Sequence, residues 1–297
     1  MLFTNQVSPC QQVSSRLFPG MDLWMKRDDM LHPQVSGNKF RKLKYPLQAL
    51  QGQSTHVVSM GGIWSNHIHA LAHAAHALGL PATALIRGAS GMHSAMLDDV
   101  VALGMQVQFV NREAYRQLRA DDTAWRSHIV VPDQRTLWLP EGGSAPQALR
   151  GVAELVAELP FIPDYLVLAC GTGATLAGVL AGLGGRSRVL GIAAISHGDY
   201  LRADISRLLD QAGYPDYQNY ELLTGYHHGG YGKVSAGLTD FCHEFQQETA
   251  IPLEPVYTGK MMYALRQLWH DGYLAQNARV VAVHTGGLQG ARGFARR

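Results

Sequence analysis

Cysteine is scarce in this sequence, and neither sign of charge is in clear excess. Cys10, Cys170 and Cys242 lie far apart in 297 residues and form no paired spacing of the kind that marks a disulfide framework or a cysteine-based zinc site. The 25 basic and 23 acidic side chains leave a formal charge of +2. A balance this close to zero argues against a nucleic-acid partner or an anionic membrane surface, because both call for a basic excess.

Long apolar runs are also missing. No basic stretch followed by an apolar segment opens the chain, and glycine or histidine interrupts the other apolar stretches before they reach the length of a membrane span. Together with the few cysteines, this predicts a cytoplasmic protein with no membrane partner. With 46% hydrophobic and 16% charged residues, the composition is globular, and the length suits one large domain or two intertwined ones.

Glycine, by contrast, is abundant, and its 32 copies cluster where short apolar runs end. The clearest helix spans 68–78, where apolar residues recur at amphipathic spacing up to Gly79. Strands that alternate with helices predict parallel sheets, with ligands at the carboxyl ends of the strands. Because no low-complexity linker is present, a second domain must be inserted within the first. The predicted strands are 55–60, 82–86, 106–110, 165–169, 189–193 and 280–284.

The first candidate for chemistry is Lys39, which follows the turn Gly37-Asn38 at the start of a predicted helix. Arg41, Lys42 and Lys44 follow closely, and neighbouring cations depress the pKa of a lysine. A lysine that loses its proton near neutral pH is the form that Schiff-base chemistry requires. The alternative is an ordinary basic first turn, although the helix dipole slightly disfavours cations there.

Two turns between a strand and a helix are candidates for binding anions. Ser65, Asn66 and His67 open the helix 68–78, where free backbone N–H groups can hold a carboxylate; plain helix capping is the alternative. The second turn is Gly-rich, and its N–H groups and hydroxyls suit a phosphate, although it lacks the lysine of a P-loop and the spacing of a dinucleotide fingerprint. It consists of Gly171, Thr172, Gly173, Ala174 and Thr175.

Two later segments and a set of histidines carry weaker signals. Segments 255–260 and 284–287 place hydroxyls at the ends of predicted elements, which is also typical of hydroxyls that bond locally within a turn. His69, His73 and His76 share one helix face, but no glutamate of the zinc-protease type accompanies them. We therefore expect no metal, and a solvated or cavity-lining face for these histidines.

The candidate Schiff-base lysine comes first in the chain, the candidate anion-binding turn second and the candidate phosphate turn third. With these three features in this order, the chain resembles the D-cysteine desulfhydrase and 1-aminocyclopropane-1-carboxylate (ACC) deaminase family of pyridoxal-phosphate (PLP) enzymes. The resemblance extends from about residue 26 to residue 287. Its blocks are 26–29, 37–39, 61–62 with 65–66, 140–144, 171–178, 255–260 and 284–287.

The resemblance implies an α/β fold of type II, with two three-layer αβα domains. The large PLP-binding domain would comprise 1–43 and 141–297, the small inserted domain 44–140, and the protein would be a homodimer. Lys39 would carry the cofactor, Asn66 would contact its phenolic oxygen, and the turn 171–175 would bind its phosphate. Ser65 would act on the substrate, whose carboxylate would lie at the helix start 65–67, while Tyr257 and Tyr231 would lie over the reacting centre.

Thr258 and Thr285 favour one branch of this family. ACC deaminases typically carry Glu and Leu at these two positions, whereas desulfhydrases carry small hydroxyl residues. A carboxylate beside the pyridine nitrogen strengthens the ring as an electron sink, and opening a cyclopropane needs that help more than expelling a thiolate does. Trp64, Ala145 and Ala174 depart from the family pattern; Ala174 is tolerable where its φ is negative.

The preferred interpretation is therefore α,β-elimination from a small amino acid such as D-cysteine, giving pyruvate and ammonia. ACC deaminase, or another small amino-acid deaminase, is the alternative on the same cofactor. A PLP-binding protein with little catalysis is a third possibility, against which the presence of Lys39, Ser65 and Tyr257 argues.

Overall fold

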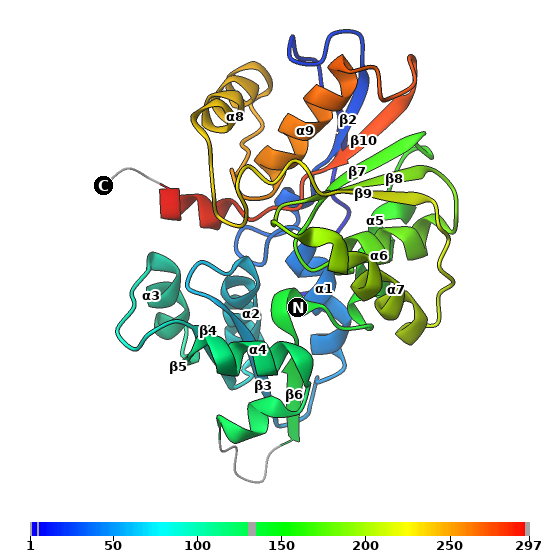
Figure 1. Ribbon diagram of the computed structural model, residues 1–297. Helices are drawn as coiled ribbons and strands as arrows, with labels where there is room; N and C mark the ends of the chain where they lie inside the picture. The colour runs from blue at the N-terminus through cyan, green and yellow to red at the C-terminus, as the bar shows by residue number, and fades with distance from the viewer. Residues whose placement is uncertain (1, 5, 130–134, 295–297) are drawn as a thin grey trace.

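Two parallel sheets organise the chain (Figure 1). The computed structural model describes residues 2–4, 6–129 and 135–294. The six-stranded sheet has the order β1-β2-β10-β7-β8-β9, and its strands run parallel except for the antiparallel edge strand β1. These strands are β1 Cys10–Gln12, β2 Asp22–Lys26, β7 Tyr165–Cys170, β8 Arg188–Ala193, β9 Tyr220–Leu223 and β10 Arg279–Val283.

The second sheet has four parallel strands in the order β5-β4-β3-β6, and all four come from residues 55–139. They lie within the expected insertion 44–140. The expected boundary after residue 43 falls inside helix α1, which continues without a break from Asn38 to Gln48. The strands are β3 Thr55–Gly62, β4 Ala82–Arg87, β5 Gln106–Val110 and β6 Arg135–Leu139.

Helices cover both faces of each sheet, which gives two three-layer units. In the six-stranded unit, α8 and α9 pack on one face and α5, α6 and α7 on the other (Figure 1). In the four-stranded unit, α1, α2 and α3 share one apolar cluster, and α4 belongs to the opposite one. Besides α1, the helices are α2 Asn66–Leu78, α3 Ala95–Ala102, α4 Arg112–Ala120, α5 Ala148–Ala157, α6 Ala174–Leu183, α7 Leu201–Gln211, α8 Ala236–Thr249 and α9 Thr258–His270.

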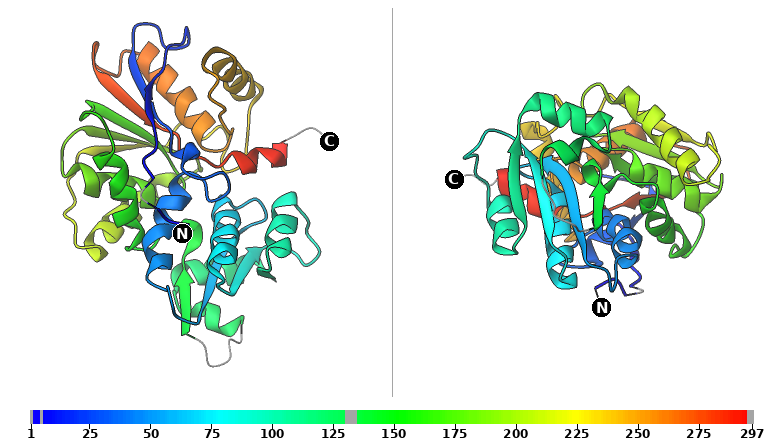
Figure 2. Two further views of the ribbon diagram at one scale, coloured as in Figure 1. Left: turned by 180° about the vertical axis from the view of Figure 1, so that it is seen from behind. Right: turned by 90° about the horizontal axis from the view of Figure 1, so that it is seen from below.

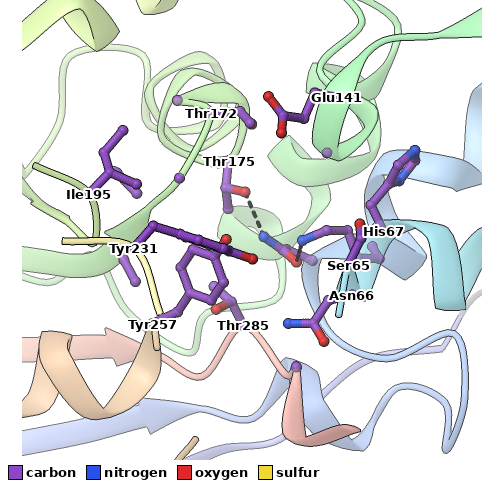
Figure 3. Close-up of a pocket in the computed structure, with 18 of the residues that line it drawn as sticks. Ser65, Asn66, His67, Glu141, Thr172, Thr175, Ile195, Tyr231, Tyr257 and Thr285 are labelled. Carbon is purple, nitrogen blue, oxygen red and sulfur yellow. Dashed lines mark hydrogen bonds between the residues drawn. The ribbon is translucent and has the colours of Figure 1, made fainter. Parts of the chain in front are cut away.

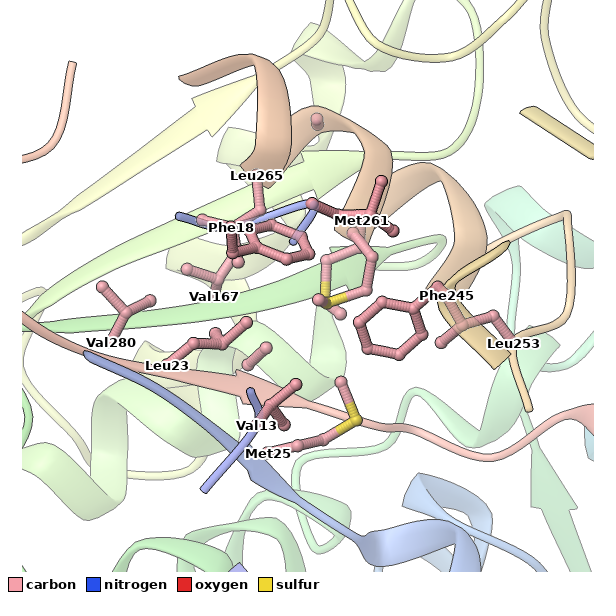
Figure 4. Close-up of a cluster of buried hydrophobic side chains, with 14 of the residues drawn as sticks. Val13, Phe18, Leu23, Met25, Val167, Phe245, Leu253, Met261, Leu265 and Val280 are labelled. Atoms are coloured by element: carbon pink, nitrogen blue, oxygen red, sulfur yellow. The ribbon is translucent and has the colours of Figure 1, made fainter. Parts of the chain in front are cut away.

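The core beneath α9 shows how apolar spacing builds these layers (Figure 4). Met261 and Leu265 are one helical turn apart and point from α9 onto the sheet, where they join Leu23 of β2 and Val280 of β10. All four side chains are fully buried. The strands here are continuous apolar runs, as expected when helices cover both faces of a parallel sheet.

All six strands predicted from sequence are present: 106–110 has the predicted ends, and the ends of the other five differ by at most two residues. The helix predicted at 68–78 extends back to Asn66. Four strands were missed: β1, β2, β6 and β9. Each contains charged or amide side chains that interrupt the apolar pattern, as in the sequences Asp22–Lys26 and Arg135–Leu139. Their pairing partners, rather than their own composition, make them strands.

A buried ionic cluster joins α1 to the six-stranded unit. Arg41 donates from Nε to Asp28 Oδ2 over 2.6 Å and from Nη2 to Asp28 Oδ1 over 2.8 Å. Its other N–H groups reach the Glu158 carboxylate beyond the end of α5, which also pairs with the fully buried Lys26. Because these charges have left water, each depends on its partners to offset the cost of burial.

The C-terminal turn η5 (Leu288–Phe294) follows β10 and packs on the other unit, as both views of Figure 2 show. Arg292 pairs with Asp99 of α3 at 2.6 Å, and Gly293 packs against the ring of Trp64. Among the residues that the structure describes, no helix combines the length and the apolar character needed to cross a membrane.

We expect Asp28→Ala to lower the free energy of unfolding by about 3 kcal/mol, because it leaves part of the buried Arg41 charge unpaired. Urea unfolding of the wild type and the variant measures this difference. Asp204→Ala is the matched control, because Asp204 pairs with Arg207 at 3.0 Å on the protein surface. Its effect should stay within about 0.5 kcal/mol. Equal effects of the two variants would contradict a special role for the buried cluster.

Candidate functional site

A cavity of about 390 Å³ lies where the carboxyl ends of strands from both sheets meet. Its wall includes Gly62 and Arg87 from the ends of β3 and β4, and Cys170 from the end of β7. This is the position at which parallel α/β sheets bind ligands. Of the residues predicted from sequence, the cavity brings together Lys39, Ser65, Asn66, His67, Gly171, Thr172, Gly173, Thr175, Tyr231, Tyr257 and Thr285.

Lys39 occupies the first turn of α1, and backbone packing fixes its place. The preceding Gly37 has φ 63°, and a Cβ there would lie only 1.9 Å from the carbonyl oxygen of Thr285, so this approach requires glycine. The Lys39 Nζ donates to Asn38 Oδ1 over 2.8 Å. Removal from water lowers the pKa of Lys39 to about 8, and the negative charge of Glu254 partly opposes this shift.

The explanation that the sequence suggested for this pKa is wrong in part. Arg41 is bound by carboxylates, and Lys44 donates to both oxygens of Glu154 over 2.8 Å, so neither cation acts on Lys39. Burial is the main cause instead. Lys42 does lie nearby: burial and the charge of Lys39 hold its own pKa well below the ordinary value of 10.5.

The Gly-rich turn 171–175 leads from β7 into α6 and offers the N-terminus of that helix to the cavity. Gly173 has φ 77° and is the residue before the helix. Thr175 Oγ1 accepts a hydrogen bond from Asn38 Nδ2 over 2.8 Å, so the turn is tied directly to the residue before Lys39 (Figure 3). Ala174 is helical, with negative φ, so this departure from the family pattern causes no strain.

Ser65, Asn66 and His67 begin α2 on the other side of the cavity. Ser65 Oγ caps the helix by accepting the Ile68 N–H over 3.2 Å, and Asn66 Oδ1 accepts a hydrogen bond from Gln289 of η5. The ring of His67 is buried. Burial, with the charges of Lys39 and Lys42, holds the pKa of His67 well below 6.5, so it is neutral at physiological pH.

Two tyrosine rings face Ser65 and Asn66 across the cavity (Figure 3). The ring centroids of Tyr231 and Tyr257 are 6.1 Å apart, and Tyr257 packs over Gly171, where a Cβ would lie 3.0 Å from the ring. Burial raises the pKa of both hydroxyls above the ordinary value of 10, Tyr257 the more strongly. Both tyrosines therefore keep their protons at neutral pH and can donate hydrogen bonds.

Thr258 does not line the cavity. Its side chain is fully buried, and Oγ1 lies 3.3 Å from Oε1 of Glu254, a residue that the sequence analysis missed. Glu254 is also fully buried, accepts the backbone N–H groups of residues 256, 257 and 258, and forms no ion pair within the described ranges. Burial raises the pKa of Glu254 to about 7, although these N–H groups oppose the shift.

Three further residues noted in the sequence lie away from this cavity, and for His69 this contradicts the expectation. Trp64 packs against Gly293 of η5, and Ala145 is buried beside a neighbouring hollow, so neither lines this cavity. His69 is neither solvated nor cavity-lining: it is buried between α2 and α3, 3.5 Å from Asp99. Burial lowers the pKa of His69 to about 4.

The proteins to which this chain is similar are pyridoxal-phosphate dependent enzymes or carry the names of such enzymes. The family model for "Pyridoxal-phosphate dependent enzyme" matches residues 5–286. The chain is 29% identical to a bifunctional D-cysteine desulfhydrase/ACC deaminase of Arabidopsis thaliana, over 91% of this chain and 73% of the relative. It is 29% identical to an ACC deaminase of Ralstonia pickettii, over 95% and 91%. A crystal structure of an ACC deaminase homologue superposes with a TM-score of 0.82 at 28% identity, covering 98% of this chain and 92% of that one.

A lysine and a glycine-rich helix start that share one cavity between two α/β units define a fold type II PLP-dependent enzyme. The chain belongs to the pyridoxal-phosphate dependent enzyme family, and it is similar to ACC deaminase and D-cysteine desulfhydrase enzymes within it. Its residues fit the cofactor. The free N–H groups at the start of α6 suit a phosphate, and the lowered pKa of Lys39 suits attachment to an aldehyde.

The raised pKa of Glu254 predicts a pH-dependent stability difference between the wild type and Glu254→Gln. As pH rises from about 4.5 to about 7, this glutamate ionises in the unfolded chain but stays protonated in the folded protein, so the wild type loses stability. The glutamine does not titrate. The free energy of unfolding of the variant, minus that of the wild type, should therefore increase by up to about 3 kcal/mol across this interval.

Urea unfolding at pH 5, 6, 7 and 8 measures this difference, which should level off above pH 7. The glutamine amide faces backbone N–H groups and lowers stability by an amount that does not depend on pH. The prediction is therefore tested by how the difference in the free energy of unfolding changes with pH. A difference that stays constant over the series would contradict the raised pKa of Glu254.

Proposed function

We propose that this enzyme catalyses α,β-elimination from a small amino acid with a good β-leaving group, as in D-cysteine desulfhydration. The observation that supports this choice is the cavity wall. It offers the hydroxyl of Thr285, and its one carboxylate among the described residues, Glu141, already accepts the Tyr115 hydroxyl and pairs with Arg119. A cofactor ring without a free carboxylate partner suits expulsion of a thiolate better than cyclopropane opening.

The roles of the cavity residues follow from their positions. The turn 171–175 holds the cofactor phosphate, and Asn66 contacts the ring. The backbone N–H groups that begin α2 hold the substrate carboxylate. PLP, when bound, supplies an electron sink for the negative charge that develops at Cα. Lys39 would hold the cofactor, and its free amine would accept the Cα proton at Nζ.

The leaving group departs on the side of the two tyrosines. The Cβ–S bond breaks, sulfur keeps the electron pair, and the protonated hydroxyl of Tyr257 or Tyr231 stabilises the departing hydrosulfide by donating a hydrogen bond. Solvent then protonates the hydrosulfide to hydrogen sulfide. Water then releases pyruvate and ammonia. Ser65 orients the substrate at the start of α2.

ACC deaminase is the second candidate, and Glu254 is the observation that favours it. A Cβ at Gly287, which lines the cavity, would lie 3.7 Å from Cγ of Glu254, so an acidic group is present directly behind the cavity wall. With a pKa of about 7 it is only partly ionised at neutral pH, which weakens its action on a cofactor ring. We therefore keep β-elimination as the preferred reaction.

We predict that borohydride reduction of the holoenzyme fixes the cofactor to Lys39. The pKa of this amine, about 8, is close to neutral pH, and the amine borders the phosphate turn. Peptide mapping by mass spectrometry identifies the modified lysine. Lys260 is the matched comparison, because burial lowers its pKa to about 8 as well, but its Nζ donates to the carbonyl oxygens of Ala194 and Gly230. An adduct on Lys260 would move the cofactor site away from the turn 171–175.

We also predict that the holoenzyme forms pyruvate from D-cysteine with a higher kcat/KM than it deaminates ACC. The physical reason is the hydroxyl-lined wall at Thr285, which offers less support for ring opening. Keto-acid release from D-cysteine, L-cysteine, D-serine and ACC gives the four values on one enzyme preparation. A preference for ACC would establish the second candidate in place of the first.

A further inference from the structure

Arg87 is a cationic side chain at the cavity, and the proposed reaction gives this residue no role. It is the last residue of β4, it is exposed, and it lines the same cavity as Lys39. Within residues 2–4, 6–129 and 135–294, no carboxylate forms an ion pair with it. A guanidinium that keeps its full charge at a cavity wall favours an anion there.

The structure holds this guanidinium in place without using its hydrogen-bond donors. Its central carbon lies 5.4 Å from the ring centroid of Tyr115, a buried side chain of α4. The Tyr115 hydroxyl donates to Glu141 Oε1 over 2.5 Å, which fixes the ring on which Arg87 rests. Stacking on a ring leaves the N–H groups at the edge of the guanidinium free to bind two oxygens of one anion.

Arg119, at the same cavity, differs from Arg87 because a carboxylate pairs with its charge. It also lines the wall and stacks on a tyrosine, with 5.6 Å to the ring centroid of Tyr200. Unlike Arg87, it pairs with Glu141, at 3.2 Å. The charge of Arg119 is therefore matched within the protein, whereas that of Arg87 is left for a ligand.

We infer that Arg87 binds an anionic β-substituent of the substrate, so that the enzyme acts on amino acids that carry an oxyanion such as a sulfate ester at Cβ. This inference rests on the proposed function, which already assigns the cofactor phosphate to the turn 171–175 and the substrate carboxylate to the start of α2. Arg87 is then available for a third anion. Lys42 also lines the cavity, but its Nζ donates to the carbonyl oxygen of Gly142 over 3.1 Å, and burial holds its pKa well below 10.5.

The elimination step balances without a proton for the leaving group. Lys39 Nζ accepts the Cα proton, the Cβ–O bond breaks, and sulfate departs with the bonding electron pair. Sulfate is too weak a base to need protonation, so the tyrosine hydroxyls are not required in this case. Water then converts the remaining three-carbon unit to pyruvate and ammonia, as with D-cysteine.

The test compares two substrates whose leaving groups need no proton and which differ in charge: O-sulfoserine and β-chloroalanine, each as D and L enantiomers. Arg87→Gln should raise the KM for O-sulfoserine about tenfold, as expected for the loss of one charge-assisted contact. It should leave kcat and the KM for β-chloroalanine within about twofold, while Arg87→Lys keeps part of the effect of the charge.

Arg126→Gln is the matched control. Arg126 stacks on Trp125 at 5.4 Å in the same unit but does not line the cavity, so its removal should change neither KM. The Arg87 inference is overturned if Arg87→Gln raises the KM for O-sulfoserine and the KM for β-chloroalanine equally, or raises neither. Turnover of β-chloroalanine would still support the proposed function in that case.

A titration that needs no turnover separates the two proposals further. The dissociation constant of O-sulfoserine, read from the absorbance change of the bound cofactor, should be about tenfold weaker in Arg87→Gln than in the wild type. Equal constants would refute the role of Arg87. A wild type that binds O-sulfoserine in this way but forms pyruvate from neither substrate would refute the proposed elimination instead, and would leave the anion contact established.

Discussion

The close backbone contact between Gly37 and Thr285 is the constraint on which the site depends. It brings the start of α1 against the loop after β10, where the Asn38 N–H donates to the Thr285 carbonyl over 3.1 Å. The Asn38 side chain then reaches Thr175 on one side and Lys39 on the other. One residue thereby connects Lys39 to the glycine-rich turn 171–175 and to the end of the central strand. Any side chain at Gly37 would separate all three.

Partial exclusion of water sets the chemistry of the groups around that contact. The same removal from water lowers the pKa of Lys39 and His67, which favours their neutral forms, and raises the pKa of Glu254 and Tyr257. A neutral amine can accept a proton, and a protonated phenol can donate a hydrogen bond. The site therefore keeps a base and hydrogen-bond donors available at the same pH without a strong ion pair at either group.

Much of the site was predictable from local signals, because each anion-binding turn joins one strand to the next helix. The structure confirms that Ser65 caps a helix and that the glycine-rich turn leads into one, although this second helix begins at Ala174, inside the predicted turn. The reason given for the pKa of Lys39 was wrong, since sequence proximity places Arg41 near it, whereas the fold turns Arg41 toward Asp28. Glu254 and Arg87 gave no local signal: an ordinary acidic residue becomes significant when it is buried, and an ordinary basic one when it borders a cavity.

The sequence by itself determined the class of fold and the strand-to-helix turns that border the cavity, because apolar periodicity and glycine turns act over a few residues. Only the tertiary structure decided which side chains meet. Tyr231 faces Tyr257, Asn66 faces Gln289, and Trp64 lies under η5 rather than in the cavity. These contacts join segments far apart in the chain, so burial and charge at each position depend on how the two sheets pack together, which no short stretch of sequence encodes.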